Sequence, residues 1–155
     1  MGGGYSPELI AHPAEPGLLY LRTDIGSVYR WNPNTRQWMP LTDYHAPSDY
    51  NLNAPESIAL DPTDPDRLYI AAGKYTAAQR RHSAQPVHAF GGGDFYSTAT
   101  GKGTAFTKVN TTTLPAGNGA IVASFANAGD LWLSTGNNGL HHSPDGGSPG
   151  PSFRA

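Results

Sequence analysis

Cysteine is absent from this chain of 155 residues, which excludes disulfide bonds and thiolate metal sites. Charge is scarce as well: charged residues make up 14% of the sequence, and the formal net charge is −2. No stripe of Lys and Arg extends beyond Arg80 and Arg81, so we expect no nucleic-acid partner. No apolar run approaches membrane-spanning length, so we expect no membrane partner, and residues 1–5 lack the basic and apolar segments of a signal peptide.

Glycine and proline, in contrast, are abundant. The chain has 19 glycines and 14 prolines, well above average usage, and no helical periodicity lasts longer than a turn or two. Hydrophobic residues make up 37% of the sequence, enough for a modest core in one domain. We therefore predict a single all-β domain over residues 1–155, built from short strands and many turns.

An internal repeat indicates the architecture. Residues 10–21 align with residues 59–70 at a constant offset of 49, and the two copies share both prolines and a Leu-Tyr-aliphatic strand. A looser third copy at residues 130–135 matches residues 18–23. Repeats of this length, built from short strands and punctuated by Gly and Pro, are typical of β-propeller blades. We predict a partial β-propeller of about three blades, with repeats near 5–45, 54–110 and 118–155 and an irregular loop over 77–94.

Two segments near blade ends resemble the Asp-box of sialidase-type propellers, Ser-x-Asp-x-Gly-x-Thr-Trp/Phe. Ser143, Asp145 and Gly147 match its first part, although five residues intervene before Phe153. Residues 97–109 look like a second box that has lost its Asp. Asp and Gly at hairpin tips are what turn geometry selects, so these boxes are expected to be structural.

The hairpin over residues 18–31 carries the strongest candidate for chemistry. An aliphatic and aromatic run is followed by a tight turn at Thr23, Asp24 and Gly26, and a second run begins at Val28. Gly26 can adopt the positive φ that such a turn demands, and the hairpin places one carboxylate, Asp24, at its tip. Without further information, an Asp at a hairpin tip is usually structural, because it hydrogen-bonds to the backbone.

A family resemblance favours a functional role for Asp24. It is carried by Gly2-Gly3-Gly4-Tyr5, by His12-Pro13-Ala14-Glu15-Pro16, by Arg22-Thr23-Asp24-Ile25-Gly26-Ser27-Val28-Tyr29-Arg30-Trp31, by Trp38-Met39-Pro40-Leu41 and by residues 56–76. These stretches resemble the xyloglucan-degrading glycoside hydrolases of family 74. Residues 107–110 and 129–135 also look familial, whereas residues 77–94 do not.

The resemblance implies two seven-bladed propellers that face each other across a cleft and hydrolyse the β-1,4-glucan backbone of xyloglucan with inversion. Two aspartates would perform this chemistry, one from each propeller. Asp24 occupies the position of the general base, and Ser27 replaces the usual second glycine of the motif. No counterpart of the general acid is found, so the chain resembles a truncated or internally deleted relative with weak or no activity alone. The resemblance also implies a secreted protein that acts on plant cell-wall xyloglucan.

The remaining candidates have simpler interpretations. Tyr29 and Trp31 are candidates for stacking on sugar rings, although aromatics in a blade more often pack between sheets. His82, His88 and the adjacent His141 and His142 lack the spacing of a metal site, and no cofactor motif is intact, so we expect neither metal nor cofactor. The crowded acidic residues Asp61, Asp64 and Asp66 are interpreted as turn residues, because prolines replace the glycine that a calcium loop needs.

Two classes of function remain open. One is a glycosidase, or the remnant of one, that acts on xyloglucan; the other is a non-catalytic propeller fragment that binds glycan or protein. A second catalytic carboxylate is the feature that would distinguish them. Three blades also leave blade edges open, so we expect self-association through those edges.

Overall fold

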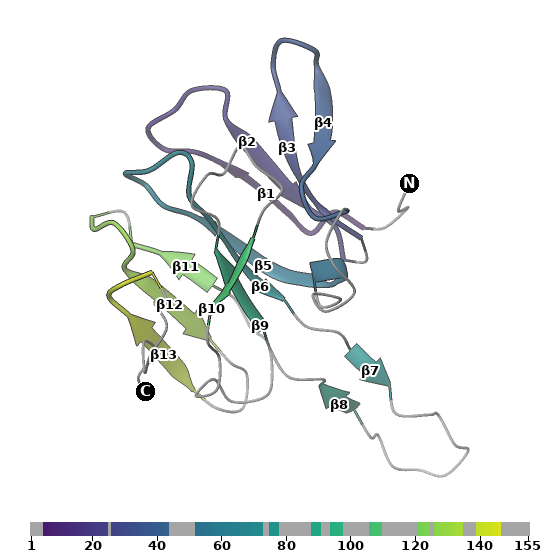
Figure 1. Cartoon of the computed structure of the whole chain (residues 1–155), viewed down its shortest axis with the longest axis vertical. Coiled ribbons are helices and arrows are strands. Elements are labelled where there is room, and N and C mark those ends of the chain that lie inside the picture. The colour runs from purple at the N-terminus through teal and green to yellow at the C-terminus, as the bar shows by residue number, and fades with distance from the viewer. Residues whose placement is uncertain are drawn as a thin grey trace.

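The computed structural model describes residues 5–24, 26–43, 52–72, 75–77, 88–90, 94–97, 106–109, 121–124, 126–134 and 139–146. These residues form strands and turns without an α-helix, arranged as successive antiparallel sheets (Figure 1). Within these ranges, no helix is long and apolar enough to cross a membrane.

The first sheet is a four-stranded meander. Its strands β1 (Glu8–Ala11), β2 (Leu19–Arg22), β3 (Val28–Asn32) and β4 (Gln37–Pro40) pair in chain order. Short turns suffice for this arrangement because each strand is antiparallel to the one before it. Asn32 shapes the β3–β4 turn, since its Oδ1 accepts hydrogen bonds from the backbone N–H groups of Asn34 (3.0 Å) and Thr35 (3.3 Å).

The second sheet contains an insertion. Its order is β5 (Pro55–Leu60), β6 (Leu68–Ala72), β9 (Asp94–Ser97) and β10 (Thr107–Val109). Between β6 and β9 the chain forms a separate pair, β7 (Tyr75–Ala77) with β8 (His88–Phe90), which projects away from the sheets in Figure 1. The irregular loop expected over 77–94 stays a prediction, because only Ala77, His88–Phe90 and Asp94 of that segment are among the described residues.

The third sheet consists of β11 (Ile121–Ala123), β12 (Leu131–Ser134) and β13 (Leu140–Ser143). The chain therefore runs through three sheets in succession, and each sheet is antiparallel. The bounds predicted for the repeats stay a prediction, because residues between the sheets lie partly outside the described ranges.

Two hydrophobic clusters join the three sheets. In the first, Tyr20 and Val28 of the first sheet pack with Ile58, Leu68 and Ile70 of the second. Each of these side chains is at most 1% exposed.

The second cluster lies between the second and third sheets. It joins Tyr69 and Ala71 of β6 to Leu131 and Leu133 of β12. Successive side chains of a strand point to opposite faces, so β6 contributes Ile70 to one cluster and Tyr69 to the other. This blade-on-blade arrangement confirms the predicted class, all-β with a partial β-propeller.

Candidate functional site

The turn between β2 and β3 presents Asp24 at the surface. Its side chain is exposed, and its backbone N–H donates to the carbonyl of Tyr5 at 2.9 Å. Gly26 has φ +139°, and a Cβ there would lie 2.9 Å from Thr23 Oγ1, so this position accepts only glycine without strain. The N–H of Gly26 donates to the carbonyl of Asn53 at 3.0 Å, which anchors the turn to the segment before β5.

Buried hydroxyl groups fix the backbone beside Asp24. Thr23 Oγ1 accepts from the N–H of Ser27 at 3.2 Å, and the Oγ of Ser27 lies 2.9 Å from Thr42 Oγ1. Thr42 Oγ1 also accepts from the N–H of Val28 at 3.1 Å. Ser27 and Thr42 are at most 1% exposed. The sequence interpretation treated Ser27 only as a small departure from the family motif, whereas its hydroxyl connects two segments of the first sheet.

A charged pair ties the base of this turn to the second sheet. Arg22 Nε donates to Glu8 Oε2 at 2.7 Å, and the same Oε2 accepts from the N–H of Ile58 at 3.2 Å. Arg22 Nη1 donates to the carbonyl of Pro55 at 2.9 Å. The Asp24 turn is therefore supported from both sheets, which preorganises an exposed carboxylate.

Tyr29 and Trp31 lie on the first-sheet face opposite to Tyr20. Tyr29 is opposite Leu21 in the β2–β3 register, and the ring of Trp31 lies 5.3 Å from that of Trp38 at an angle of 59°. Both Tyr29 and Trp31 are half-buried. They share this apolar sheet face with Leu21, and their stacking on sugar rings stays a prediction.

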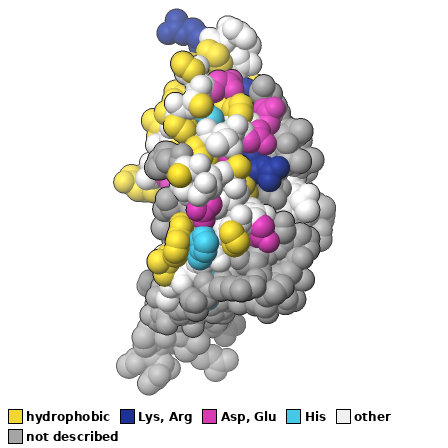
Figure 2. All heavy atoms as spheres, turned by 90° about the vertical axis from the view of Figure 1, so that its left-hand side faces the viewer, with side chains coloured by type: hydrophobic (Ala, Val, Ile, Leu, Met, Phe, Trp, Pro, Cys, Tyr) yellow, Lys and Arg dark blue, Asp and Glu magenta, His cyan; other side chains and the backbone are white. Residues whose placement is uncertain are grey.

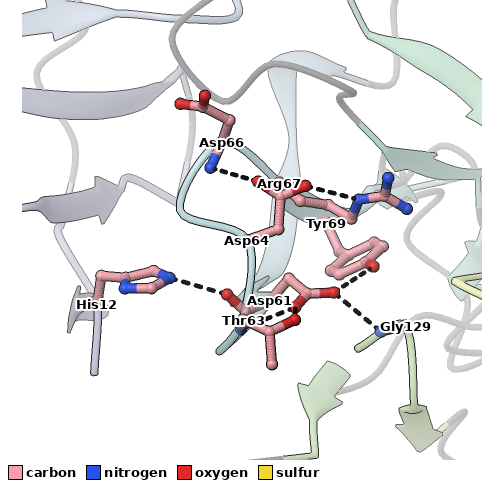
Figure 3. Close-up of polar contacts among 8 residues, drawn as sticks. All are labelled: His12, Asp61, Thr63, Asp64, Asp66, Arg67, Tyr69 and Gly129. Carbon is pink, nitrogen blue, oxygen red and sulfur yellow. Dashed lines mark hydrogen bonds and ion pairs between the residues drawn. The ribbon is translucent and has the colours of Figure 1, made fainter. Parts of the chain in front are cut away.

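A second polar cluster is centred on Asp61, in the turn between β5 and β6 (Figure 3). Its Oδ1 accepts from the N–H (3.0 Å) and hydroxyl (2.8 Å) of Thr63. Its Oδ2 accepts from the hydroxyl of Tyr69 (3.2 Å) and the N–H of Gly129 (2.9 Å). Its backbone carbonyl accepts from Nε2 of His12 at 2.8 Å. One buried residue thus connects turns of all three sheets.

The electrostatics of the cluster follow from this geometry. Burial alone raises the pKa of Asp61, but the hydrogen bonds from Thr63, Gly129 and Tyr69 outweigh it and hold the pKa below its usual value. Burial, together with the charge of Asp61, raises the pKa of Tyr69 to about 12. Asp61 therefore stays ionised and Tyr69 stays protonated at neutral pH.

A cavity of about 250 Å³ opens beside this cluster, lined by Asp61, Asp64, Arg67, Ala128, Gly129 and Asp145. Its carboxylates are already engaged: Asp64 Oδ2 lies 3.5 Å from Arg67 Nε, and Asp145 Oδ1 accepts from the Ser143 hydroxyl at 2.7 Å. The arrangement braces the turns rather than presenting free ligands. The sequence identified Asp61 as a turn residue but missed its contacts across sheets, although its alignment with His12 in the repeat was a signal.

The histidines show no metal-binding arrangement in the described part of the chain. His141 is buried, and His142 Nε2 hydrogen-bonds to Asp130 Oδ1 while its ring stacks on Trp132 at 4.3 Å. This hydrogen bond lowers the pKa of Asp130. Among the residues that the structure describes, no group of three or more His, Asp or Glu is placed to hold a metal ion.

No family model matches the chain. A probable oligoxyloglucan-reducing end-specific xyloglucanase of Neosartorya fischeri is 40% identical over 151 residues, which cover 93% of this chain and 17% of that protein. An oligoxyloglucan-reducing end-specific xyloglucanase of Emericella nidulans is 58% identical over 74 residues, or 48% of this chain and 9% of that protein. The chain thus spans less than a fifth of the length of these curated relatives.

Two solved structures that are similar to this chain are, like the sequence relatives, enzymes of the xyloglucanase group. The GH74 xyloglucanase from Xanthomonas campestris is 33% identical to this chain with a TM-score of 0.72, and the match covers 95% of this chain and 20% of the xyloglucanase. The GH74 enzyme from Niastella koreensis is 30% identical to this chain with a TM-score of 0.73, and the match covers 94% of this chain and 21% of the Niastella enzyme.

Proposed function

We propose, from the premise that this chain is a relative of the glycoside hydrolase family 74 xyloglucanases, that it supplies the general base for inverting hydrolysis of the β-1,4-glucan backbone of xyloglucan. The observation that carries this proposal is the exposed Asp24 carboxylate on a turn fixed by buried hydrogen bonds. By the same relationship, the substrate is a plant cell-wall polysaccharide and the protein is secreted.

The chemistry requires two carboxyl groups. In an inverting reaction one carboxylate deprotonates a water molecule while a carboxylic acid, about 6.5–9.5 Å away, protonates the leaving oxygen. Asp24 is suited to the first role, since its turn is held by contacts to Tyr5 and Asn53 while the side chain stays at the surface. The acid stays unassigned. Because general acid or base catalysis contributes roughly 10²–10⁴-fold per group, we expect the chain alone to act weakly.

Two further parts of the proposal concern binding. Stacking of sugar rings on Tyr29 and Trp31 has less support than the role of Asp24, because both side chains lie on an apolar sheet face together with Leu21. We also propose self-association through open blade edges, because the outer strands of each sheet pair on one side only among the described residues.

The test compares the wild-type chain with Asp24→Asn on xyloglucan oligosaccharides, with reducing-sugar release as the readout. Asp43→Asn is the matched control, because Asp43 is an exposed aspartate that follows the same sheet. We expect slow release by the wild type and by Asp43→Asn, and release at background by Asp24→Asn. Equal rates for all three proteins would refute the role of Asp24.

Two other outcomes separate the alternatives. Fast release by the wild type that disappears in Asp24→Asn would support the base and place an acid within this chain, with Asp94, Asp130 and Asp145 as the residues to substitute next. Retention on a xyloglucan affinity gel without any hydrolysis, equal for wild type and Asp24→Asn, would refute catalysis and support the glycan-binding alternative.

A further inference from the structure

The start of β5, in the second sheet, is attached to the turn that carries Asp24 in the first. The N–H of Gly26 donates to the carbonyl of Asn53 at 3.0 Å, and Arg22 Nη1 donates to the carbonyl of Pro55 at 2.9 Å. The two donors stand on either side of Asp24 in the sequence. The second sheet therefore holds the turn both before and after the carboxylate.

Glu8 adds a third attachment, from the strand that pairs with β2. It lies opposite Arg22 in the β1–β2 register, and its Oε2 accepts from Arg22 Nε at 2.7 Å and from the N–H of Ile58 at 3.2 Å. Hydrogen bonds to a charged acceptor are stronger than those between neutral groups. The side chains of Arg22 and Glu8 are only 15% and 27% exposed, so solvent screens the pair in part. One carboxylate thus links β1, β2 and β5.

A β-bulge in β5 makes these contacts possible. The β5–β6 register shifts between Pro55 and Ser57, which makes Glu56 an extra residue on β5. In a regular strand the backbone groups of successive residues point to alternate edges, so groups three residues apart face opposite edges. The extra residue allows the carbonyl of Pro55 and the N–H of Ile58 to face the first sheet together. Bulges are frequent beside active sites, where they redirect a side chain.

We propose that Glu8, acting through Arg22, is a positioning residue for Asp24. Glu8 sets the direction of the Asp24 turn relative to the second sheet, while the side chain of Asp24 stays exposed. Direction matters because a displacement of about 1 Å at a catalytic group can cost roughly 10²-fold in rate. The catalytic part of this inference rests on the proposed function of Asp24. Glu8 lies outside every stretch that carries the family resemblance, so only its contacts in the structure point to it.

The first measurement is amide hydrogen exchange of the full chain, by NMR, for the wild type and Glu8→Gln. Glutamine keeps the size of the side chain but loses the charge that binds Arg22. We expect the hydrogen-bonded N–H groups of Asp24 and Gly26 to exchange about tenfold faster, with exchange in β6 unchanged. If Glu8 only stabilised the fold, exchange in β6 would rise as well. An equal rise in β6, or no rise at Asp24 and Gly26, would overturn the proposal.

Glu15→Gln is the matched control, because it makes the same chemical change on the same sheet. Glu15 lies in the turn between β1 and β2, and this turn and the Asp24 turn are at opposite ends of β2 (Figure 1). Figure 2 shows the side of the molecule on which the β1–β2 turn lies, where acidic side chains are interspersed with polar and hydrophobic ones. Exchange at Asp24 and Gly26 should be the same in Glu15→Gln as in the wild type.

A double-mutant cycle tests the route through Arg22. If Glu8 acts through Arg22, the double variant Glu8→Gln/Arg22→Gln should speed exchange at Asp24 no more than the stronger of the two single substitutions does. Additive effects of the two substitutions would overturn this route, because they would mean that each residue holds the turn independently.

Kinetics on xyloglucan oligosaccharides separate this inference from the proposed function. We expect Glu8→Gln to lower kcat about tenfold or more with KM unchanged, because a misdirected base weakens only the transition state. A wild-type kcat in Glu8→Gln, together with loss of activity in Asp24→Asn, would overturn the positioning role and leave the proposed base in place. Equal release by the wild type and Asp24→Asn would refute the proposed function, and hydrogen exchange would still decide whether Glu8 holds the turn.

Discussion

Replacing Asp61 should show how much its hydrogen bonds between the sheets add to stability beyond its role in the β5–β6 turn. Asp61→Ala removes the acceptor of four hydrogen bonds, from Thr63, Tyr69 and Gly129, at a position that is 1% exposed. The N–H of Gly129 and the hydroxyl of Tyr69 would then lose a buried partner. Thr63 sits at the surface, so water can replace its lost bonds.

The magnitude follows from those two buried donors. Leaving a buried donor unsatisfied costs about 1–3 kcal/mol, so Asp61→Ala should lower the free energy of unfolding by about 2–6 kcal/mol. Asp61→Asn should cost about 1–2 kcal/mol, because its single oxygen can still accept from Tyr69 and Gly129 while its NH₂ group faces Thr63. Asp64→Ala, which removes an exposed ion pair with Arg67, should cost at most about 1 kcal/mol.

The assay is urea denaturation of wild type, Asp61→Ala, Asp61→Asn and Asp64→Ala, followed by tryptophan fluorescence. The pKa of folded Asp61 is lowered, so its ionised form stabilises the fold above the unfolded value of about 3.9. That contribution is lost as the pH falls from about 4 through the lower folded pKa. The advantage of the wild type over Asp61→Asn should therefore shrink over this window.

Equal destabilisation by Asp61→Ala and Asp64→Ala at pH 7 would refute the reasoning. It would mean that the contacts of Asp61 with Tyr69 and Gly129 add nothing beyond an ordinary turn. A difference between wild type and Asp61→Asn that does not change below pH 4 would show that the charge of Asp61 is not what these donors stabilise.

Two further substitutions test the network around the sheets. His12→Asp should lower the free energy of unfolding, measured by urea denaturation, by about 1 kcal/mol, because a carboxylate can still accept from the N–H groups of Ala14 and Glu15 but cannot donate to the carbonyl of Asp61. An unchanged denaturation midpoint would contradict the hydrogen bond from His12 to Asp61. Ser27→Gly should lower the free energy of unfolding by about 1–3 kcal/mol, because the N–H of Thr42 loses its acceptor at a buried site and a glycine adds conformational freedom to the unfolded chain. A variant more stable than the wild type would contradict this role of the Ser27 hydroxyl.

Pairing between strands distant in sequence was beyond prediction. The β7–β8 pair separates β6 from its partner β9, and the short Tyr75–Ala77 and His88–Phe90 segments have no alternation that reveals them. Which strand follows β6 in the sheet depends on contacts made across the insertion, and local propensity contains no information about them.

Local features of the sequence determined the all-β class and the Asp24 turn. Abundant Gly and Pro, short alternating runs and the 49-residue repeat can all be recognised in the sequence itself, and Gly26 permits the positive φ that the turn after Asp24 requires. These inferences hold because turn geometry and strand alternation depend on neighbouring residues.

Only the tertiary structure decided which residues connect the sheets and which faces stay open. The sequence identifies Asp61 only as a turn residue, but in the structure the N–H of Gly129, 68 residues away, donates to its carboxylate. Tyr69 and Trp132 occupy equivalent strand positions, yet one is buried and the other exposed, because burial depends on whether another sheet lies against that face. A side chain's position in its strand sets the direction in which it points, and the neighbouring sheet decides whether it meets protein or water.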